Sequence, residues 1–177
     1  MTQRELVLTK EYLNETFSYV DGELFWKARP VHHFKTEWAQ KVFNSRQANT
    51  KAGTVLHGYT QVGFAFGKLA AHRIIFVMHH GYAPEEVDHI DGNPSNNLLS
   101  NLRAVTHGQN MINAKTSARN TSGYKGVYWH KTTNKWSASI RHNCKLKHLG
   151  LFVDIEDARA ARKLAESQFH GEFANER

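Results

Sequence analysis

The chain has 177 residues, of which 40% are hydrophobic, and a formal net charge of +7 at pH 7. This length allows one modest domain or two small ones, and we expect two. The positive charge favours a polyanionic partner, of which nucleic acid is the first to consider. No apolar stretch approaches the roughly 18 residues of a membrane span, and the first ten residues are polar, so we expect no membrane and a cytoplasmic location.

The single cysteine, Cys144, excludes an intramolecular disulfide and any multi-cysteine zinc site, so no structural zinc is expected. The charges are unevenly distributed. From Gly92 to Val153 there is no Asp or Glu, while nine Lys or Arg residues occur there. A run of one sign attracts a phosphate backbone through counterion release, although it could also be a plain solvated surface.

The first 80 residues predict a short α+β segment. The pattern indicates a helix after Thr9, a hairpin, an irregular connection over 28–52, a second hairpin, and a helix that Gly81 ends. The expected ranges are strands Ser18–Val20 and Glu23–Trp26 around Asp21-Gly22, a strand over 59–66 that turns at Gly67-Lys68 onto Leu69–His72, and a helix Arg73–His80 with Ile74, Val77 and Met78 inward.

The next segment is dense in polar residues. It predicts a strand ending near Asp88-His89, a polar loop, a second strand Leu102–Val105, and a helix from about Thr106. Residues 114–122 have linker composition, because almost nothing in them can be buried, and we place the domain boundary there. The expected domains are therefore 1–113 and 123–177.

The C-terminal part predicts three short strands and one helix. The strands are expected at Gly126–His130, Trp136–Arg141 and Lys147–Phe152, and the helix at Ile155–His170 between Asp154 and Gly171. Alternation places Val127, Trp129, Trp136, Ala138 and Ile140 on one face and Tyr128, His130, Ser137, Ser139 and Arg141 on the other. Small residues Ala158, Ala161 and Ala165, with Phe169, mark the helix face that packs on the sheet.

The central polar segment resembles a known family. Asp88-His89-Ile90-Asp91-Gly92, then Asn96-Asn97, Asn101-Leu102-Arg103 and Asn110 with Asn113, resembles the His-Asn-His homing endonucleases of phages and mobile introns. The upstream stretch His72-Arg73-Ile74-Ile75, with Gly81, Pro84 and Val87, is similar too. The resemblance implies a ββα-metal fold with one divalent ion, Mg²⁺ or Mn²⁺.

In that family pattern His89 is the general base, Asn101 holds the loop, and Asp88 and Asn110 are metal ligands. Phosphodiester hydrolysis needs a base for the attacking water and a cation for the developing charge, and hard oxygen ligands suit Mg²⁺ or Mn²⁺. Some relatives have His in the last position, and His107 is the alternative to Asn110. Asp91 and Asn113 are expected to be structural supports, and His72 a buried residue.

Residues 122–174 resemble the plant ethylene-response-factor DNA-binding domain, which is also appended to phage nucleases of this kind. The resemblance depends on Gly123-Tyr124-Lys125-Gly126-Val127, Lys135-Trp136, Ile140-Arg141, Leu149-Gly150-Leu151-Phe152 and Glu156-Asp157-Ala158-Arg159-Ala160-Ala161. It implies a three-stranded sheet that contacts the major groove and a helix packed behind it. Several positions depart from the plant pattern, so we expect binding without an inherited sequence preference.

The DNA contacts expected from these patterns are Arg103 in the nuclease segment and, in the C-terminal domain, Lys125, Tyr128, His130, Lys135, Ser139, Arg141, Lys145, Lys147 and His148.

Together these features predict a homing-type, metal-dependent endonuclease of double-stranded DNA that leaves 5′-phosphate and 3′-hydroxyl ends. We expect no small-molecule cofactor and a monomer, with a dimer as the alternative. A phage-encoded protein of this kind would act in the bacterial cytoplasm. The rival hypotheses are a DNA-binding regulator with a catalytically idle nuclease fold, and an RNA-binding protein, which lacks the expected aromatic signature.

Overall fold

The computed structural model describes residues 9–113, 116, 120–142 and 145–170. The chain divides into two compact units, Met1–Thr106 and His107–Arg177. Within the described residues both units are mixed α/β, with helices and small antiparallel sheets. The division falls ahead of the expected linker at 114–122, of which most residues lie outside the described part, so that linker stays a prediction.

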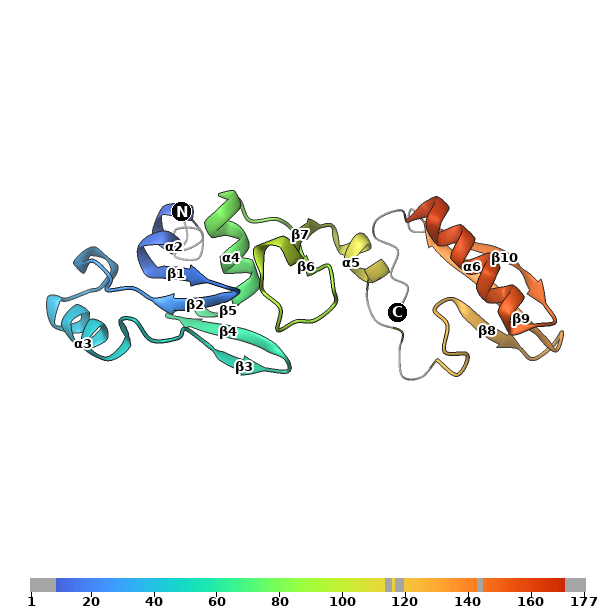
Figure 1. Ribbon diagram of the computed structural model, residues 1–177, viewed down its shortest axis with the longest axis horizontal. Helices are drawn as coiled ribbons and strands as arrows, with labels where there is room; N and C mark the ends of the chain where they lie inside the picture. The colour runs from blue at the N-terminus through green and yellow to red at the C-terminus, as the bar shows by residue number, and fades with distance from the viewer. Residues whose placement is uncertain (1–8, 114–115, 117–119, 143–144, 171–177) are drawn as a thin grey trace. The chain divides into compact units, whose positions relative to one another are not determined.

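The first unit contains three α-helices, two short 3-10 helices and seven strands in the part of the chain described (Figure 1). In chain order the α-helices and strands are α2 (Lys10–Thr16), β1 (Phe17–Val20), β2 (Glu23–Trp26), α3 (Glu37–Gln47), β3 (Thr54–Leu56), β4 (Tyr59–Phe64), β5 (Gly67–Ala70), α4 (Ala71–His80), β6 (Glu86–His89) and β7 (Leu102–Val105). The 3-10 helices are η1 (Val31–His33) and η2 (Leu99–Asn101).

The N-terminal elements agree with the sequence predictions. The Thr9 hydroxyl accepts a hydrogen bond from the Tyr12 amide (3.3 Å) and starts α2. Strands β1 and β2 pair from Phe17↔Trp26 to Val20↔Glu23, which leaves a two-residue turn. In that turn Asp21 and Gly22 both have positive φ (47° and 86°), as the tight hairpin turn requires.

The expectation of an irregular connection over 28–52 was wrong, because α3 occupies its middle. The Thr36 hydroxyl accepts from the Ala39 amide (3.1 Å) and begins this helix. No residue of α3 is buried. A helix that buries so little carries no strong apolar stripe, so the only sequence signals were Thr36 at its start and Glu37 in its first turn.

The second hairpin differs in register from the prediction. Phe64 pairs with Gly67, so the chain turns at residues 65 and 66, and Gly67 already belongs to β5. Strand β5 ends at Ala70 because α4 starts at Ala71. The short strand β3 was not predicted, since all three of its residues are exposed and show no alternation.

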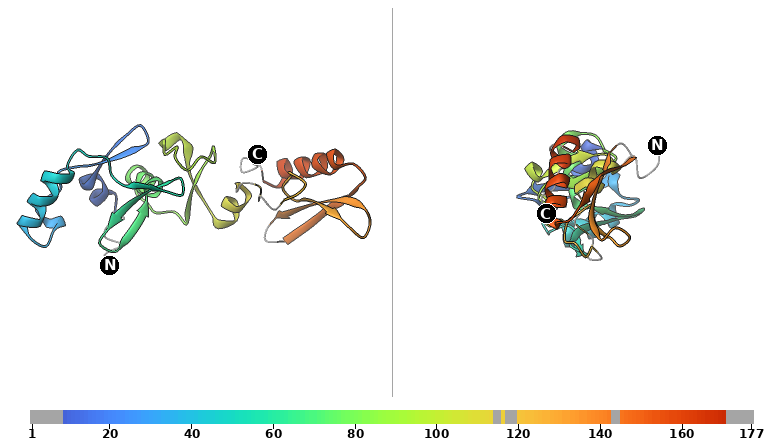
Figure 2. Two further views of the ribbon diagram at one scale, coloured as in Figure 1. Left: turned by 90° about the horizontal axis from the view of Figure 1, so that it is seen from below. Right: turned by 90° about the vertical axis from the view of Figure 1, so that its right-hand side faces the viewer.

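Helix α4 is the centre of the first unit. Seven of its residues are buried, including the three predicted to point inward, and it ends at Gly81 with φ 79°. Residues from α2, both hairpins and the β6–β7 pair form the core around it: Leu13, Phe17, Leu24, Val62, Leu69, Val87 and Leu102. Figure 2 shows the ribbon of this unit from two further sides, with α4 in green. A helix buried nearly all round fixes the elements packed on it.

The second unit begins with α5 (His107–Asn113) and continues with a three-stranded sheet and a helix. The sheet order is β10-β9-β8. The bounds are β8 (Val127–His130), β9 (Lys135–His142), β10 (Lys145–Phe152) and α6 (Ile155–Phe169). The Asp154 carboxylate accepts from the Glu156 amide (2.8 Å), as expected for the helix start, whereas Gly171 lies outside the described residues.

The contact between α6 and the sheet contains a charged residue that the sequence did not predict. Ala158 and Ala165 are buried as expected, but Arg162 is buried with them, and Ala161 is only partly buried. Arg162 donates to the Ser139 carbonyl (2.7 Å) and pairs with Glu166 (2.8 Å). Gly126 has φ 74°, and a Cβ there would collide with the same carbonyl. The small domain therefore depends on a buried polar contact as well as on apolar packing.

No helix in the described part of the chain is long and apolar enough to cross a bilayer.

Candidate active site

The β6–β7 hairpin brings the predicted nuclease residues together. The strands pair with Asp88 opposite Arg103 and His89 opposite Leu102. Asp88 and His89 are both buried, at 8% and 5% exposure. Burial of a carboxylate and an imidazole at a strand end requires specific partners for both.

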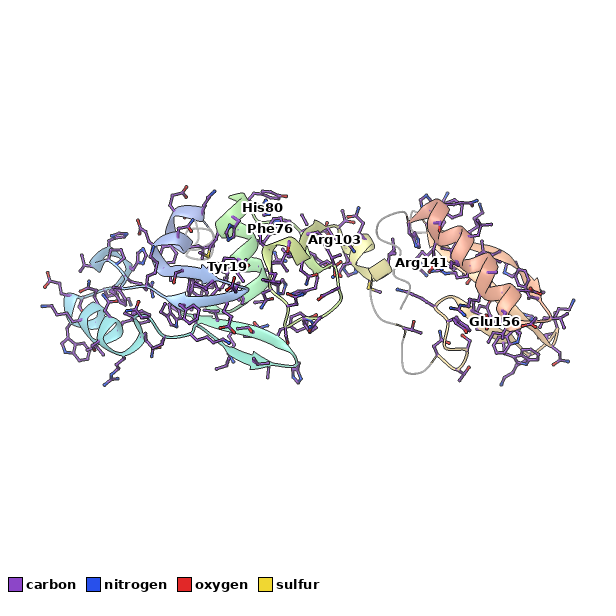
Figure 3. The ribbon with its side chains drawn as sticks, viewed as in Figure 1. Tyr19, Phe76, His80, Arg103, Arg141 and Glu156 are labelled. Carbon is purple, nitrogen blue, oxygen red and sulfur yellow. The ribbon has the colours of Figure 1, made fainter. Side chains whose placement is uncertain are left out.

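The partner of Asp88 is Arg103, which Figure 3 labels on β7. The guanidinium Nε and Nη2 donate to the same carboxylate oxygen of Asp88 at 3.1 and 3.0 Å. The side chains are 18% and 9% exposed. The charge of Arg103 compensates that of Asp88, and the DNA contact expected of Arg103 stays a prediction.

His89 is oriented by a residue to which the sequence analysis gave no role. Its Nε2 lies 3.0 Å from the amide oxygen of Asn97, which is itself 5% exposed. An amide oxygen can only accept, so Nε2 donates in this contact, and in a neutral imidazole Nδ1 then carries the lone pair. The signal was present in the motif, since Asn97 stands eight residues after His89 in the Asn96-Asn97 pair.

The loop between β6 and β7 is held by hydrogen bonds among its own side chains. The Asn101 amide donates to Asp91 Oδ1 (2.9 Å) and to the Asn96 carbonyl (2.8 Å), and its oxygen accepts from the Asp91 amide (3.0 Å). The Asn96 amide donates to the other Asp91 oxygen (2.7 Å). If Asn101 holds the loop and Asp91 orients it, as expected, hydrogen bonds of this kind are needed.

The environment of Asp91 favours its ionised form. Burial raises the pKa of this carboxyl, but the hydrogen bonds from the Asn93 amide and from Asn96 and Asn101 outweigh it, and the net pKa is below its usual value. The carboxylate thus stays charged and keeps accepting these bonds.

The first hairpin supports the same loop from outside. The Leu99 amide donates to the Tyr19 hydroxyl (3.0 Å), and Tyr19 is labelled in Figure 3. A Cβ on Gly22 would lie 3.2 Å from the Leu98 nitrogen, so the β1–β2 turn approaches the loop closely.

His72, at the start of α4, lies directly against His89. Their ring centroids are 4.8 Å apart at 61°, and His72 is 8% exposed, as expected for a buried residue. Burial, then the nearby His89 and Arg73, lowers the pKa of His72 to about 3. His72 is therefore neutral at physiological pH.

Asn110 lies on α5, in the second unit, and is partly exposed. The structure thus places this predicted metal ligand on a helix, as the sequence expected. The side chain of Asn113, the predicted brace of that helix, lies outside the described part.

On the C-terminal sheet, strand register decides which predicted contacts share the face away from α6. Val127↔Ala138 and Trp129↔Trp136 pair on the helix side, as predicted. The outward face carries Tyr128, His130, Lys135, Arg141 and His148. Ser139 belongs to this face by register but is only 7% exposed, and its DNA contact stays a prediction.

Three lysines predicted to bind DNA lie elsewhere. Lys147 pairs with Ile140 and stands 4.5 Å from the Phe169 ring of α6, and Lys145 pairs with His142, so both fall on the helix side. Neighbours in a strand face opposite ways, and Lys147 and His148 could not both face outward. Lys125 donates to the carbonyls of Met111 and Ile112 (2.8 Å each), and burial, then Arg162, lowers its pKa.

A second group of potential metal ligands lies near the N-terminus. The Nε2 atoms of His32 and His33 approach one carboxylate oxygen of Glu15, at 3.1 and 2.9 Å. Arg29 Nε donates to Nδ1 of His33 (3.2 Å), so the proton of His33 is on Nε2. A metal would need the lone pair at that nitrogen, and the cluster is better explained as a hydrogen-bonded brace.

Comparison with known proteins identifies a family domain in this part of the chain. A family model described as HNH endonuclease matches residues 69–112, which include Asp88, His89, Asn101 and Asn110. Protein 3.8 of Escherichia phage T7 is 38% identical over 88 residues, covering 50% of this chain and 72% of Protein 3.8. The Uncharacterized HNH endonuclease L560 of Acanthamoeba polyphaga mimivirus is 34% identical over 116 residues, covering 64% of this chain and 59% of that protein. No solved structure matches the chain.

Residues 69–112 are therefore an HNH endonuclease family domain. The chain belongs to one family with Protein 3.8 of phage T7.

Proposed function

We propose that the chain is a metal-dependent endonuclease of double-stranded DNA in which His89 is the general base. The observation that carries this proposal is the contact of His89 Nε2 with the Asn97 amide oxygen (3.0 Å). In a neutral imidazole this contact places the lone pair on Nδ1, and an imidazole in that form can accept a proton from an attacking water. A buried, oriented imidazole beside a carboxylate is the arrangement that phosphodiester hydrolysis needs.

Asp88 and Asn110 are the proposed ligands of one divalent cation. The donor set fits, because a carboxylate and an amide oxygen are hard ligands of the kind that Mg²⁺ and Mn²⁺ bind. The Asp88 carboxylate is already held in one orientation opposite a cationic group, Arg103. The bound metal supplies stabilisation of the charge that develops on the phosphate and the leaving oxygen. The assignment of Asn110 comes from the family resemblance, in which β6, β7 and α5 form the ββα-metal unit.

The C-terminal sheet is proposed to select the DNA target. Its outward face carries two cations, Lys135 and Arg141, and the half-exposed ring of Tyr128 (48%). Such groups contact phosphates and base edges. The resemblance to ethylene-response-factor domains and the acid-free run from Gly92 to Val153 support this role. We extend the proposal to a homing-type enzyme that acts as a monomer in the cytoplasm of an infected bacterium.

The test is cleavage of supercoiled plasmid DNA by the full chain after thorough chelation, with Mg²⁺ or Mn²⁺ then added back. We expect no cleavage without metal, restored cleavage with it, and 5′-phosphate ends. Asn97→Ala should slow single-turnover cleavage and leave DNA affinity unchanged, because it releases His89 without removing a DNA contact. Cleavage that persists without metal would refute the metal site, and DNA binding without any cleavage would favour the regulator hypothesis.

A further inference from the structure

The β3–β4 hairpin exposes apolar side chains at its end. Val55 is 69% exposed, Leu56 49% and Tyr59 40%. Leu56 pairs with Tyr59 across a two-residue turn, and Val55 pairs with Thr60, so the end of the hairpin is apolar on both faces. Exposed edge strands usually carry charges, and a group of exposed apolar residues on one instead marks an interaction surface.

This hairpin end lies beside the proposed active site. The Tyr59 ring centroid is 6.1 Å from that of His89 and 5.7 Å from that of His72. The Ser95 hydroxyl donates to the Gly58 carbonyl (3.1 Å), which ties the turn to the loop that follows His89. A Cβ on Gly58 would lie 3.1 Å from Pro94, so the two segments are in close contact. Figure 1 shows the hairpin and this loop next to each other.

The position of the hairpin end beside His89 points to DNA as its partner. DNA that places a phosphate at His89 must also cover the surface immediately around His89, and Tyr59 is part of that surface. The exposed groups are a ring and two aliphatic side chains, which match deoxyribose and base edges rather than phosphate oxygens. We infer that the hairpin end, with Tyr59 and Leu56 on one face and Val55 on the other, forms an apolar substrate-contacting surface that packs against the sugars and base edges flanking the scissile phosphate, an inference that rests on the proposed function.

The test uses the full chain and a duplex that carries a mapped cut site. The variants are Val55→Ser with Leu56→Ser, Tyr59→Ala, and Tyr59→Phe, which keeps the ring. Val31→Ser is the matched control, because Val31 is 47% exposed on η1. The measurements are KM, the single-turnover rate at saturating DNA, and equilibrium binding at several salt concentrations.

We expect the double variant and Tyr59→Ala to raise KM and Kd by about tenfold, the loss of about 1.4 kcal/mol of contact. The single-turnover rate at saturation should change less than about twofold, and the salt dependence should not change, because no phosphate contact is lost. Tyr59→Phe and Val31→Ser should behave as the wild type. Wild-type KM and Kd in the double variant and in Tyr59→Ala would overturn the inference, as would a flattened salt dependence.

Equilibrium binding separates this inference from the proposed function. If the wild-type chain binds the duplex but does not cleave it, the proposed function fails, and the Kd values of the variants still test the hairpin. Thermal unfolding of each variant excludes loss of fold, which exposed side chains are not expected to cause.

Discussion

Protonation of His72 should couple the stability of the first unit to pH. The pKa of this imidazole is lowered from 6.5 to about 3, first by burial and then by His89 and Arg73. Below pH 6.5 the unfolded chain binds a proton at His72 that the folded chain does not bind. The contribution of the neutral His72 to the free energy of unfolding is therefore fully present above pH 6.5 and is lost as the pH falls toward 3.

The size of the effect follows from the two pKa values. Each pH unit below 6.5 costs about 1.4 kcal/mol, so the free energy of unfolding should be about 2 kcal/mol lower at pH 5 than at pH 7.5 on account of His72. His33 and His79, whose pKa values are also lowered by burial, add to the total, so the contribution of His72 is the difference between the wild type and His72→Gln. The assay is urea unfolding at both pH values, followed by hydrogen exchange of peptides from α4.

The matched control is Ile75→Val, a buried change on the same helix. It should lower the free energy of unfolding by about 0.5–1.5 kcal/mol at both pH values and leave the pH dependence as in the wild type. His72→Gln should instead weaken the pH dependence. If the free energy of unfolding falls by the same amount from pH 7.5 to pH 5 in the wild type and in His72→Gln, then His72 is not the source of the pH dependence.

Three further predictions concern the second unit. Arg141→Ala should cost about 1–3 kcal/mol in binding to a preferred DNA site and little on random DNA, measured by competition binding; equal losses would make Arg141 a phosphate contact. Arg162→Ala should lower the free energy of unfolding of this unit by about 3–5 kcal/mol in urea, because Glu166 and the Ser139 carbonyl lose their partner. A loss below about 1 kcal/mol would show that this contact is not needed for stability. Gly126→Ala should lower the melting temperature, since its φ is 74° and its Cβ would meet the backbone; an unchanged melting temperature would contradict the close approach.

The sequence predicted the helix ends and turns that depend on the backbone preferences of one or two residues. Thr9, Asp21-Gly22 and Gly81 define ends and turns by their own backbone chemistry, and each occurs where it was predicted. Dense motif spacing similarly placed Asp88 and His89 on β6. Helix α3 and strand β3 were missed because none of their residues is buried, and an exposed element has no apolar periodicity to reveal it.

Side-chain partners were less predictable than positions. Arg103 is a cation in a basic segment, and only the register Asp88↔Arg103 shows that it faces a carboxylate. Lys147 was predicted with the DNA contacts because of its charge, but its strand pairing with Ile140 turns it toward α6. Such contacts depend on residues far apart in the sequence, and charge alone does not specify them.

The central claim is that His89 is the general base of DNA cleavage. The most direct measurement is the single-turnover cleavage rate of His89→Ala on the wild-type substrate, with Mg²⁺ present and with DNA affinity and circular dichroism measured on the same preparation. The account predicts a rate lower by about 10²–10⁴-fold with nearly unchanged affinity. A folded His89→Ala variant that cleaves at close to the wild-type rate would contradict it.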